Sequence, residues 1–166
     1  IQSLWSGYGK ISRYQLLDSL LQTVVVKHIA IQKAEEHPRG WNTDLSHNRK
    51  VKSYEVETYW YKYWNQHCTK SCRVPKFLGS FSKGKDKWII LEDLDAGYPI
   101  RKEHLDVEGA KVCLKWLANF HATFLGRKPT GLWEIGTYWY LDTRPDEFEN
   151  IEHLELKQKA HLIDEL

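Results

Sequence analysis

The sequence predicts an α+β fold in which an antiparallel sheet precedes a set of helices. Three observations indicate it. Alternating and β-branched segments separated by turn residues dominate residues 1–92. One stretch among them, residues 44–66, has helical periodicity instead. After Pro99 the helical pattern takes over, so we expect segregated sheet and helical parts.

The expected strands form two groups. Residues 1–4 and 11–17 flank a Gly-rich turn, and residues 23–31 follow a plausible hairpin turn at Asp18-Ser19. Residues 77–82 and 88–92 read as a second hairpin around Lys83-Gly84-Lys85-Asp86. We therefore expect five strands, the third antiparallel to the second.

The long helix of the first part is expected over residues 44–66, after a polar loop at 32–44 and before Val74-Pro75. Helical spacing places five side chains on one face. They are Ser53, Glu57, Trp60, Tyr61 and Trp64.

The helical part begins with an apolar repeat that is closed by Gly126. Its members are Ala110, Leu114, Leu117, His121 and Phe124. An aromatic, Gly-rich connector at 131–140 follows, and residues from Asp146 to Leu166 are expected to be helical again. The domain boundary is expected near residues 93–100, giving parts 1–95 and 96–166.

Composition excludes several classes of protein. Lys+Arg 24 and Asp+Glu 22 are too balanced for a nucleic-acid or membrane surface, and no apolar run approaches a transmembrane span. The odd number of cysteines, 3 in all, disfavours a secreted disulfide framework and indicates a cytoplasmic setting. We expect Cys68 and Cys72 to be free thiols rather than metal ligands.

Lys27 lies on the face of its strand that carries Val25 and Ile29, where a lysine needs an anion or a carboxylate partner. The plainer alternative is an edge lysine that reaches water. Glu57, on the aromatic face of the long helix, needs a cation in turn, and Lys27 is the obvious one. A structural ion pair without further function is the alternative.

Gly7 and Gly9 lie in the turn upstream of Lys27, where glycine lets backbone N–H groups approach phosphate oxygens. Alone, Gly-Tyr-Gly is also compatible with a plain hairpin turn. The order of glycine turn, strand lysine and helix glutamate is much more specific. His121 could serve as a general base, but a core histidine is the expectation for its apolar face.

Four segments together resemble one family, the choline/aminoglycoside kinase-like phosphotransferases, in particular the ecdysteroid-kinase-like or CHK-kinase-like branch. They are Val24-Val25-Val26-Lys27-His28, Arg49-Lys50 with Glu57-Thr58-Tyr59-Trp60-Tyr61, Leu91-Glu92-Asp93-Leu94, and Leu117-Ala118-Asn119-Phe120-His121-Ala122. The resemblance implies a protein-kinase-like N-lobe over 1–95. The first helices of an α-helical C-lobe would then occupy 96–166.

The implied activity is transfer of the ATP γ-phosphate to a hydroxyl of a small molecule, assisted by Mg²⁺. By the same resemblance, Lys27 binds the α/β phosphates, Glu57 orients Lys27, and the turn from Gly7 to Gly9 covers the phosphates. Val25 packs against adenine, whose edge meets the hinge formed by Glu92, Asp93 and Leu94. An ordinary strand-to-loop exit is the alternative for this segment.

The family's catalytic loop, His-Gly-Asp followed closely by Asn, and its later Mg²⁺-binding Asp do not occur in this sequence. The magnesium ligands are therefore expected beyond Leu166, and we expect no useful turnover from these residues alone. Two alternatives stay open: a non-catalytic nucleotide-binding module of the same fold, and a binding protein for sugars or quaternary amines. The second would use Trp60, Trp64, Trp133 and Trp139. The acceptor substrate and the oligomeric state cannot be read from the sequence.

Overall fold

The computed structural model describes residues 1–4, 7–31, 44–136 and 140–145. The chain divides into two compact units, residues 1–132 and 133–166, which we describe separately. The predicted boundary near residue 95 stays a prediction. The expected helix from Asp146 and most of the loop at 32–44 lie outside the described residues.

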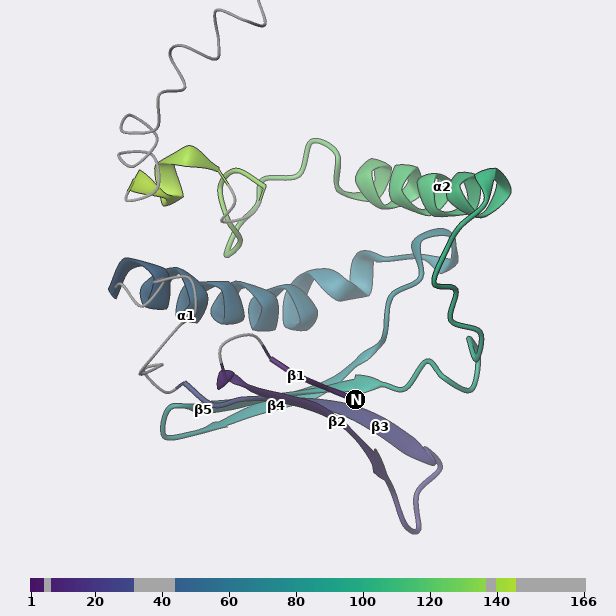
Figure 1. Ribbon diagram of the computed structural model, residues 1–166, viewed down its shortest axis with the longest axis horizontal. Coiled ribbons are helices and arrows are strands. Elements are labelled where there is room, and N and C mark those ends of the chain that lie inside the picture. Colours follow the sequence, from purple (N-terminus) through teal and green to yellow (C-terminus); the bar gives the residue numbers. More distant parts are fainter. Residues whose placement is uncertain (5–6, 32–43, 137–139, 146–166) are drawn as a thin grey trace, which may run out of the picture. The chain divides into compact units, whose positions relative to one another are not determined.

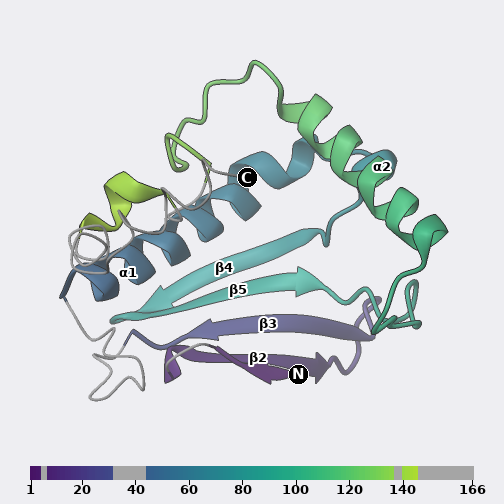
Figure 2. The same cartoon turned by 45° about the horizontal axis from the view of Figure 1, so that its top comes forward.

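The first unit contains a five-stranded antiparallel sheet, as the sequence predicts (Figures 1 and 2). The strand order is β1-β2-β3-β5-β4, and every pair of neighbours is antiparallel. The strands are β1 (Gln2–Ser3), β2 (Gly9–Gln15), β3 (Thr23–Ile29), β4 (Phe77–Lys83) and β5 (Asp86–Glu92). Together with the helices of this unit they make an α+β fold.

Turn chemistry explains where the strands differ from the expected ranges. β2 ends at Gln15, and the Leu16 N–H donates to the Gln22 carbonyl, so the β2–β3 turn is longer than a two-residue hairpin. Asp18 adopts a positive φ of 54° within it. The β4–β5 turn is tighter than expected, because Gly84, at φ 61°, lets β5 begin at Asp86.

Helix α1 (Asp44–Tyr59) lies along one face of the sheet (Figure 1). Tyr54 is its most buried residue and joins the core formed with strand residues. That core consists of Leu4, Tyr8, Ile29, Tyr54, Ile89 and Leu91, with Ile11, Ile31, Tyr61 and Phe77 packed against it. Tyr54 was not among the five face residues expected from spacing, although all five of those residues are half-buried.

The expected single helix to residue 66 changes its hydrogen bonding before it ends. α1 passes directly into a π-helix, η2 (Trp60–Trp64), where the Asn65 N–H donates to the Trp60 carbonyl. The short 3₁₀ segments η3 (Asn65–His67) and η4 (Lys70–Cys72) follow. The wider turn coincides with the aromatic run Trp60-Tyr61-Lys62-Tyr63-Trp64, and such π segments are rare in proteins.

Helix α2 (Val107–Phe124) begins earlier than the apolar repeat predicts, because the Asp106 carboxylate accepts the Gly109 N–H at 2.7 Å and caps it. Gly126, at φ 73°, closes it as expected. The buried face differs from the expected one, since Leu114, Leu117 and His121 are exposed.

The contacts of α2 explain this difference. Trp116, Phe120 and Phe124 form its aromatic side, and the Trp116 indole N–H donates to the Arg73 carbonyl. Among the described residues, α2 is covered on this aromatic side, so the expectation of a core histidine at position 121 is wrong.

The other face of the sheet carries a row of three stacked rings. The rings of Phe81, Trp88 and His28 stack across β4, β5 and β3, with centroids 4.5 and 4.6 Å apart. Asp86 Oδ2 lies 2.9 Å from the His28 Nε2. Cross-strand stacking of this kind reinforces the register of the sheet.

The second unit is described only in part. It includes Trp133 and the 3₁₀ segment η5 (Leu141–Thr143), in which both the N–H and the hydroxyl of Thr143 donate to the Tyr140 carbonyl. Trp139 lies outside the described residues.

Candidate functional site

The central feature of the candidate site is an ion pair between the sheet and α1. The Lys27 ammonium donates to both carboxylate oxygens of Glu57, at 2.8 and 2.6 Å. The two side chains are 15% and 31% exposed, respectively, so the pair is partly buried. The predicted contact between these residues is therefore present.

Local sequence explains why these two groups meet. Lys27 lies in the middle of β3 between Ile11 of β2 and Ile89 of β5, on the sheet face that packs against α1. Glu57 is near the C-terminal end of α1, on the side of Tyr54 and Tyr61. Two apolar side chains in place of such a partly buried pair are often no less stabilising, so the presence of the charges calls for an explanation beyond packing.

Tyrosines surround the pair. The Lys27 ammonium lies 5.1 Å from the centroid of the Tyr54 ring, a cation–π distance. Burial, and secondly the charge of Glu57, raise the pKa of Tyr61 above its usual value. The low polarity that these rings create strengthens the attraction between Lys27 and Glu57.

The turn from Gly7 to Gly9 lies beside the C-terminal end of β3. Gly9, at φ 128°, pairs with Ile29, and a Cβ there would lie 2.0 Å from the His28 carbonyl oxygen. Gly7, at φ 71°, faces open space instead. Gly9 is therefore required by the close approach of two strands, whereas Gly7 is required only by its backbone conformation.

The residue between these glycines has a role that the sequence did not indicate. Tyr8 is buried, and its hydroxyl shares a 2.6 Å hydrogen bond with the Nδ1 of His47 on α1. Its ring lies 6.1 Å from the ring of Tyr54, and the Lys50 ammonium lies 5.6 Å from the Tyr8 ring centroid. Through Tyr8 the glycine turn is attached to the helix that carries Glu57.

Val25 precedes Lys27 by two residues and therefore lies on the same face of β3. It is half-buried and pairs with Leu91 of β5. This places Val25 between Lys27 and the end of β5, where the chain leaves the sheet.

The side chain of Glu92, the last residue of β5, forms hydrogen bonds with other residues of the protein. Its carboxylate accepts from the Arg73 guanidinium at 2.6 Å and from the Lys76 N–H at 3.0 Å. The hydrogen bond from Arg73 is the main reason that the pKa of Glu92 lies below its usual value. Its own N–H donates to the Lys76 carbonyl at 2.9 Å.

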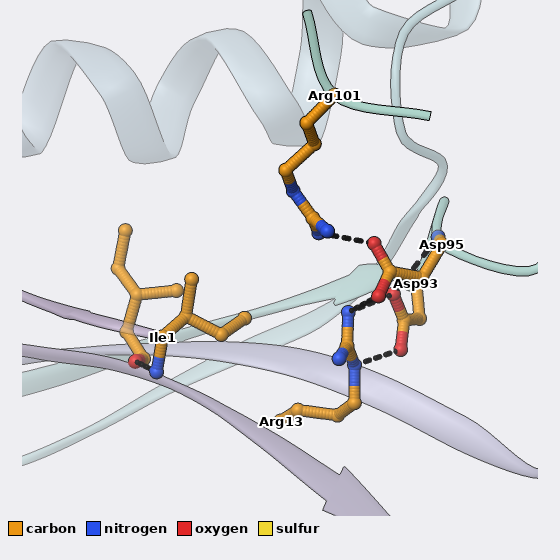
Figure 3. Close-up of polar contacts among 6 residues, drawn as sticks. Ile1, Arg13, Asp93, Asp95 and Arg101 are labelled. Atoms are coloured by element: carbon orange, nitrogen blue, oxygen red, sulfur yellow. Dashed lines mark hydrogen bonds and ion pairs between the residues drawn. The ribbon is translucent and has the colours of Figure 1, made fainter. Parts of the chain in front are cut away.

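Asp93 joins the same exit to β2 (Figure 3). Its carboxylate accepts from the Arg13 Nε at 2.5 Å and from a second Arg13 nitrogen at 3.1 Å, a bidentate contact. Arg13 also contacts Asp95, which in turn pairs with Arg101. The hydrogen bond from Arg13 lowers the pKa of Asp93.

The Leu94 carbonyl accepts from the N–H groups of Gly97 and Tyr98, at 3.1 and 2.8 Å. The side chains of Glu92 and Asp93 thus hold the exit of β5 in place through contacts within the protein. The sequence did not indicate Arg13 or Arg73. The only available signal for Arg13 was a charged residue on the inward face of β2.

The proposed aromatic ligand site has a packing role in the structure. The rings of Trp60 and Trp64 lie 6.2 and 5.9 Å from Phe120 and Phe124 of α2, respectively, and the Trp64 indole N–H donates to the Thr130 carbonyl. Trp133 belongs to the other unit.

Within the described ranges, no group of three or more His, Cys, Asp or Glu side chains converges to hold a metal ion. Cys68, Cys72 and Cys113 are free thiols. No helix in the part of the chain that the structure describes has the length and apolar character to cross a membrane.

Comparison with known proteins gives no assignment. No protein-family model, curated protein or solved structure matches the chain.

Proposed function

We propose that the chain is the ATP-binding part of a kinase-like small-molecule phosphotransferase. The observation that carries the proposal is the bidentate contact between Lys27 of β3 and Glu57 of α1, partly buried between sheet and helix. In protein kinases a lysine on the third strand and a glutamate on the following helix form such a pair, and the lysine contacts the ATP phosphates.

The neighbouring features support a nucleotide more than a plain structural ion pair. A glycine turn, a strand lysine, a helix glutamate and a strand exit follow one another along the chain, as in that class of enzyme. Val25 lies between Lys27 and the exit, so a ring stacked on it would place its phosphates near Lys27. A structural pair alone requires none of these neighbours.

In this proposal, Lys27 contacts the α and β phosphates and Glu57 fixes the direction of Lys27. The turn from Gly7 to Gly9 covers the phosphates, and adenine packs on Val25.

Main-chain groups of residues 92–94 hold the adenine edge. The Lys76 N–H donates to the Glu92 carboxylate rather than to its main-chain carbonyl, and the Leu94 carbonyl is used by Gly97 and Tyr98. The Glu92 carbonyl and the Leu94 N–H are therefore the acceptor and donor that the proposal assigns to adenine.

Phosphoryl transfer also needs Mg²⁺ and a group that positions the hydroxyl to which the γ-phosphate is transferred. The sequence contains no His-Gly-Asp motif, and we assign no described residue to the metal. The proposal therefore assigns nucleotide binding alone to the described residues and derives no catalytic step from them. A non-catalytic nucleotide-binding module of the same fold would have the same ATP contacts.

The test is calorimetric titration of the purified chain with ATP. We expect measurable binding that weakens at least about tenfold in Lys27→Gln, because a charge-assisted contact to phosphate is lost. The matched control is Lys87→Gln. Lys87 also reaches from the sheet to α1, where it pairs with Glu55 at 3.1 Å.

Equal ATP affinity in the Lys27 and Lys87 variants, or no affinity in the unmodified chain, would overturn the proposal. The melting temperature of each variant without ligand shows whether it is folded. A sugar or quaternary amine that binds while ATP does not would favour the aromatic alternative instead.

A further inference from the structure

A second lysine borders the region of the Lys27–Glu57 pair. Lys50 of α1 is half-buried and lies about two helical turns before Glu57, so the two residues point to the same side of the helix. The Lys50 ammonium lies over the ring of Tyr8, 5.6 Å from its centroid. Lys50 thus contacts the residue at the centre of the glycine turn.

The two lysines are connected through a pair of tyrosine rings. Tyr8 and Tyr54 lie 6.1 Å apart, Lys50 lies over Tyr8, and the Lys27 ammonium lies 5.1 Å from Tyr54. The hydrogen bond between Tyr8 and His47 fixes the first ring against α1. Two ammonium groups therefore approach the same site, one from the sheet and one from the helix.

Electrostatics support this proximity. Burial, and secondly the positive charge of Lys27, lower the pKa of Lys50. Both oxygens of Glu57 are directed at Lys27. An anion that enters beside Lys27 therefore gains from the charge of Lys50 as well, in a setting where partial burial strengthens the attraction.

The register of the strands gives the direction in which a nucleotide would extend. The exit of β5 and Val25 lie toward one end of β3, whereas Gly9 pairs with Ile29 at the other end. A nucleotide with its base on Val25 and its α and β phosphates near Lys27 continues toward the glycine turn. The phosphates farthest from the base then reach Tyr8 and Lys50.

We propose that Lys50 is a second phosphate-binding residue, which contacts the terminal phosphates from the helix side beneath the glycine turn. The inference rests on the proposed binding of ATP. It assigns to α1 two tasks: Glu57 directs Lys27, and Lys50 supplies positive charge where the polyphosphate ends. The ligand it selects for is an adenine nucleotide with a polyphosphate rather than a monophosphate.

The experiment titrates the chain with ATP, ADP and AMP by calorimetry. For Lys50→Gln we expect ATP affinity to fall about tenfold or more and AMP affinity to change less than about twofold. Lys50→Arg should keep ATP affinity within about threefold, because the cation is retained. Lys52→Gln is the matched control, since it removes the same charge from an exposed position of the same helix.

The outcomes separate this inference from the proposal on which it rests. If the unmodified chain binds none of the three nucleotides, both fail. If Lys27→Gln weakens ATP binding while Lys50→Gln behaves like Lys52→Gln, only the role of Lys50 is refuted.

Equal losses for AMP and ATP would show that Lys50 acts through the fold, which also refutes it. Lys50→Met keeps the apolar stem against Tyr8 and replaces the glutamine variant if that variant does not fold.

Discussion

The close approach of Gly9 to β3 allows a quantitative test with a built-in control. An alanine Cβ at position 9 would lie 2.0 Å from the His28 carbonyl oxygen, 3.0 Å from its carbon and 3.1 Å from the Ala30 nitrogen. Carbon–oxygen contacts ordinarily begin near about 3.3 Å, so the two strands must separate by roughly 1 Å. The same turn also contains Gly7, where a Cβ would meet nothing within 4 Å.

The expected costs follow from these geometries. Gly7→Ala carries only the strain of a positive φ, about 1 kcal/mol. Gly9→Ala adds the clash with main-chain atoms, and separation of the strands endangers the hydrogen bond from the Ala30 N–H to the Tyr8 carbonyl. We expect a loss of about 3 kcal/mol or more, which is about 2 kcal/mol beyond the loss in Gly7→Ala.

Urea denaturation followed by far-UV circular dichroism and tryptophan fluorescence measures the difference. With slopes of about 1–3 kcal/mol/M, the midpoints of the two variants should differ by roughly 1 M. Coincident midpoints with equal slopes would show that the turn does not approach β3 this closely.

Three further predictions concern acid stability, the connector and turnover. The folded-state pKa values of Glu92 and Asp93 are lowered, so their contribution to stability is present above the ordinary carboxyl pKa and is lost as pH falls below about 4. The urea midpoint of the double variant Glu92→Gln, Asp93→Asn should therefore depend less on pH between 5 and 3 than the midpoint of the unmodified chain. An unchanged pH dependence would contradict this. Gly131→Ala should lower the melting temperature by several degrees, since a Cβ there would lie 2.2 Å from the Tyr59 ring, whereas Gly136→Ala, with open space around it, serves as the control. Incubation of the chain with ATP, Mg²⁺ and a set of hydroxyl compounds should yield no phosphate transfer, and the appearance of a phosphorylated product would refute the prediction.

The sheet and its ion pair were accessible from sequence because both depend on local periodicity. Alternation in a strand fixes which side chains share a face, so Lys27 could be assigned to the face of Val25 and Ile29. Helical spacing likewise placed Glu57 on the half-buried side of α1. Opposite charges on facing apolar surfaces are more stable when they pair, and Lys27 and Glu57 do pair.

The parts that escaped prediction depend on partners distant in the chain. Arg13 pairs with Asp93 across the sheet, and Tyr8 bonds to His47 on α1. Strand alternation places Arg13 on the inward face of β2, but local spacing identifies neither partner. The apolar repeat of α2 is present in the sequence, but contacts with Trp60, Cys72 and Arg73 bury a different face of the helix, the one that carries Trp116 and Phe120. Periodicity identifies an apolar surface and does not identify its neighbour.

The π-helical segment after Tyr59 has a consequence for how this region tolerates change. A helix that continued with 3.6 residues per turn would lock the orientation of Trp60 and Trp64 to that of Glu57. The widened turn at Trp60–Trp64 changes that orientation, and both tryptophan rings lie against Phe120 and Phe124 while Glu57 keeps its contact with Lys27. Removing one residue there would let the segment return to α-helical hydrogen bonding and would leave the downstream residues close to their present orientation, because a π-helical turn holds about one residue more than an α-helical turn. The π-helical segment can therefore lose one residue while the side chains on either side of it keep their neighbours.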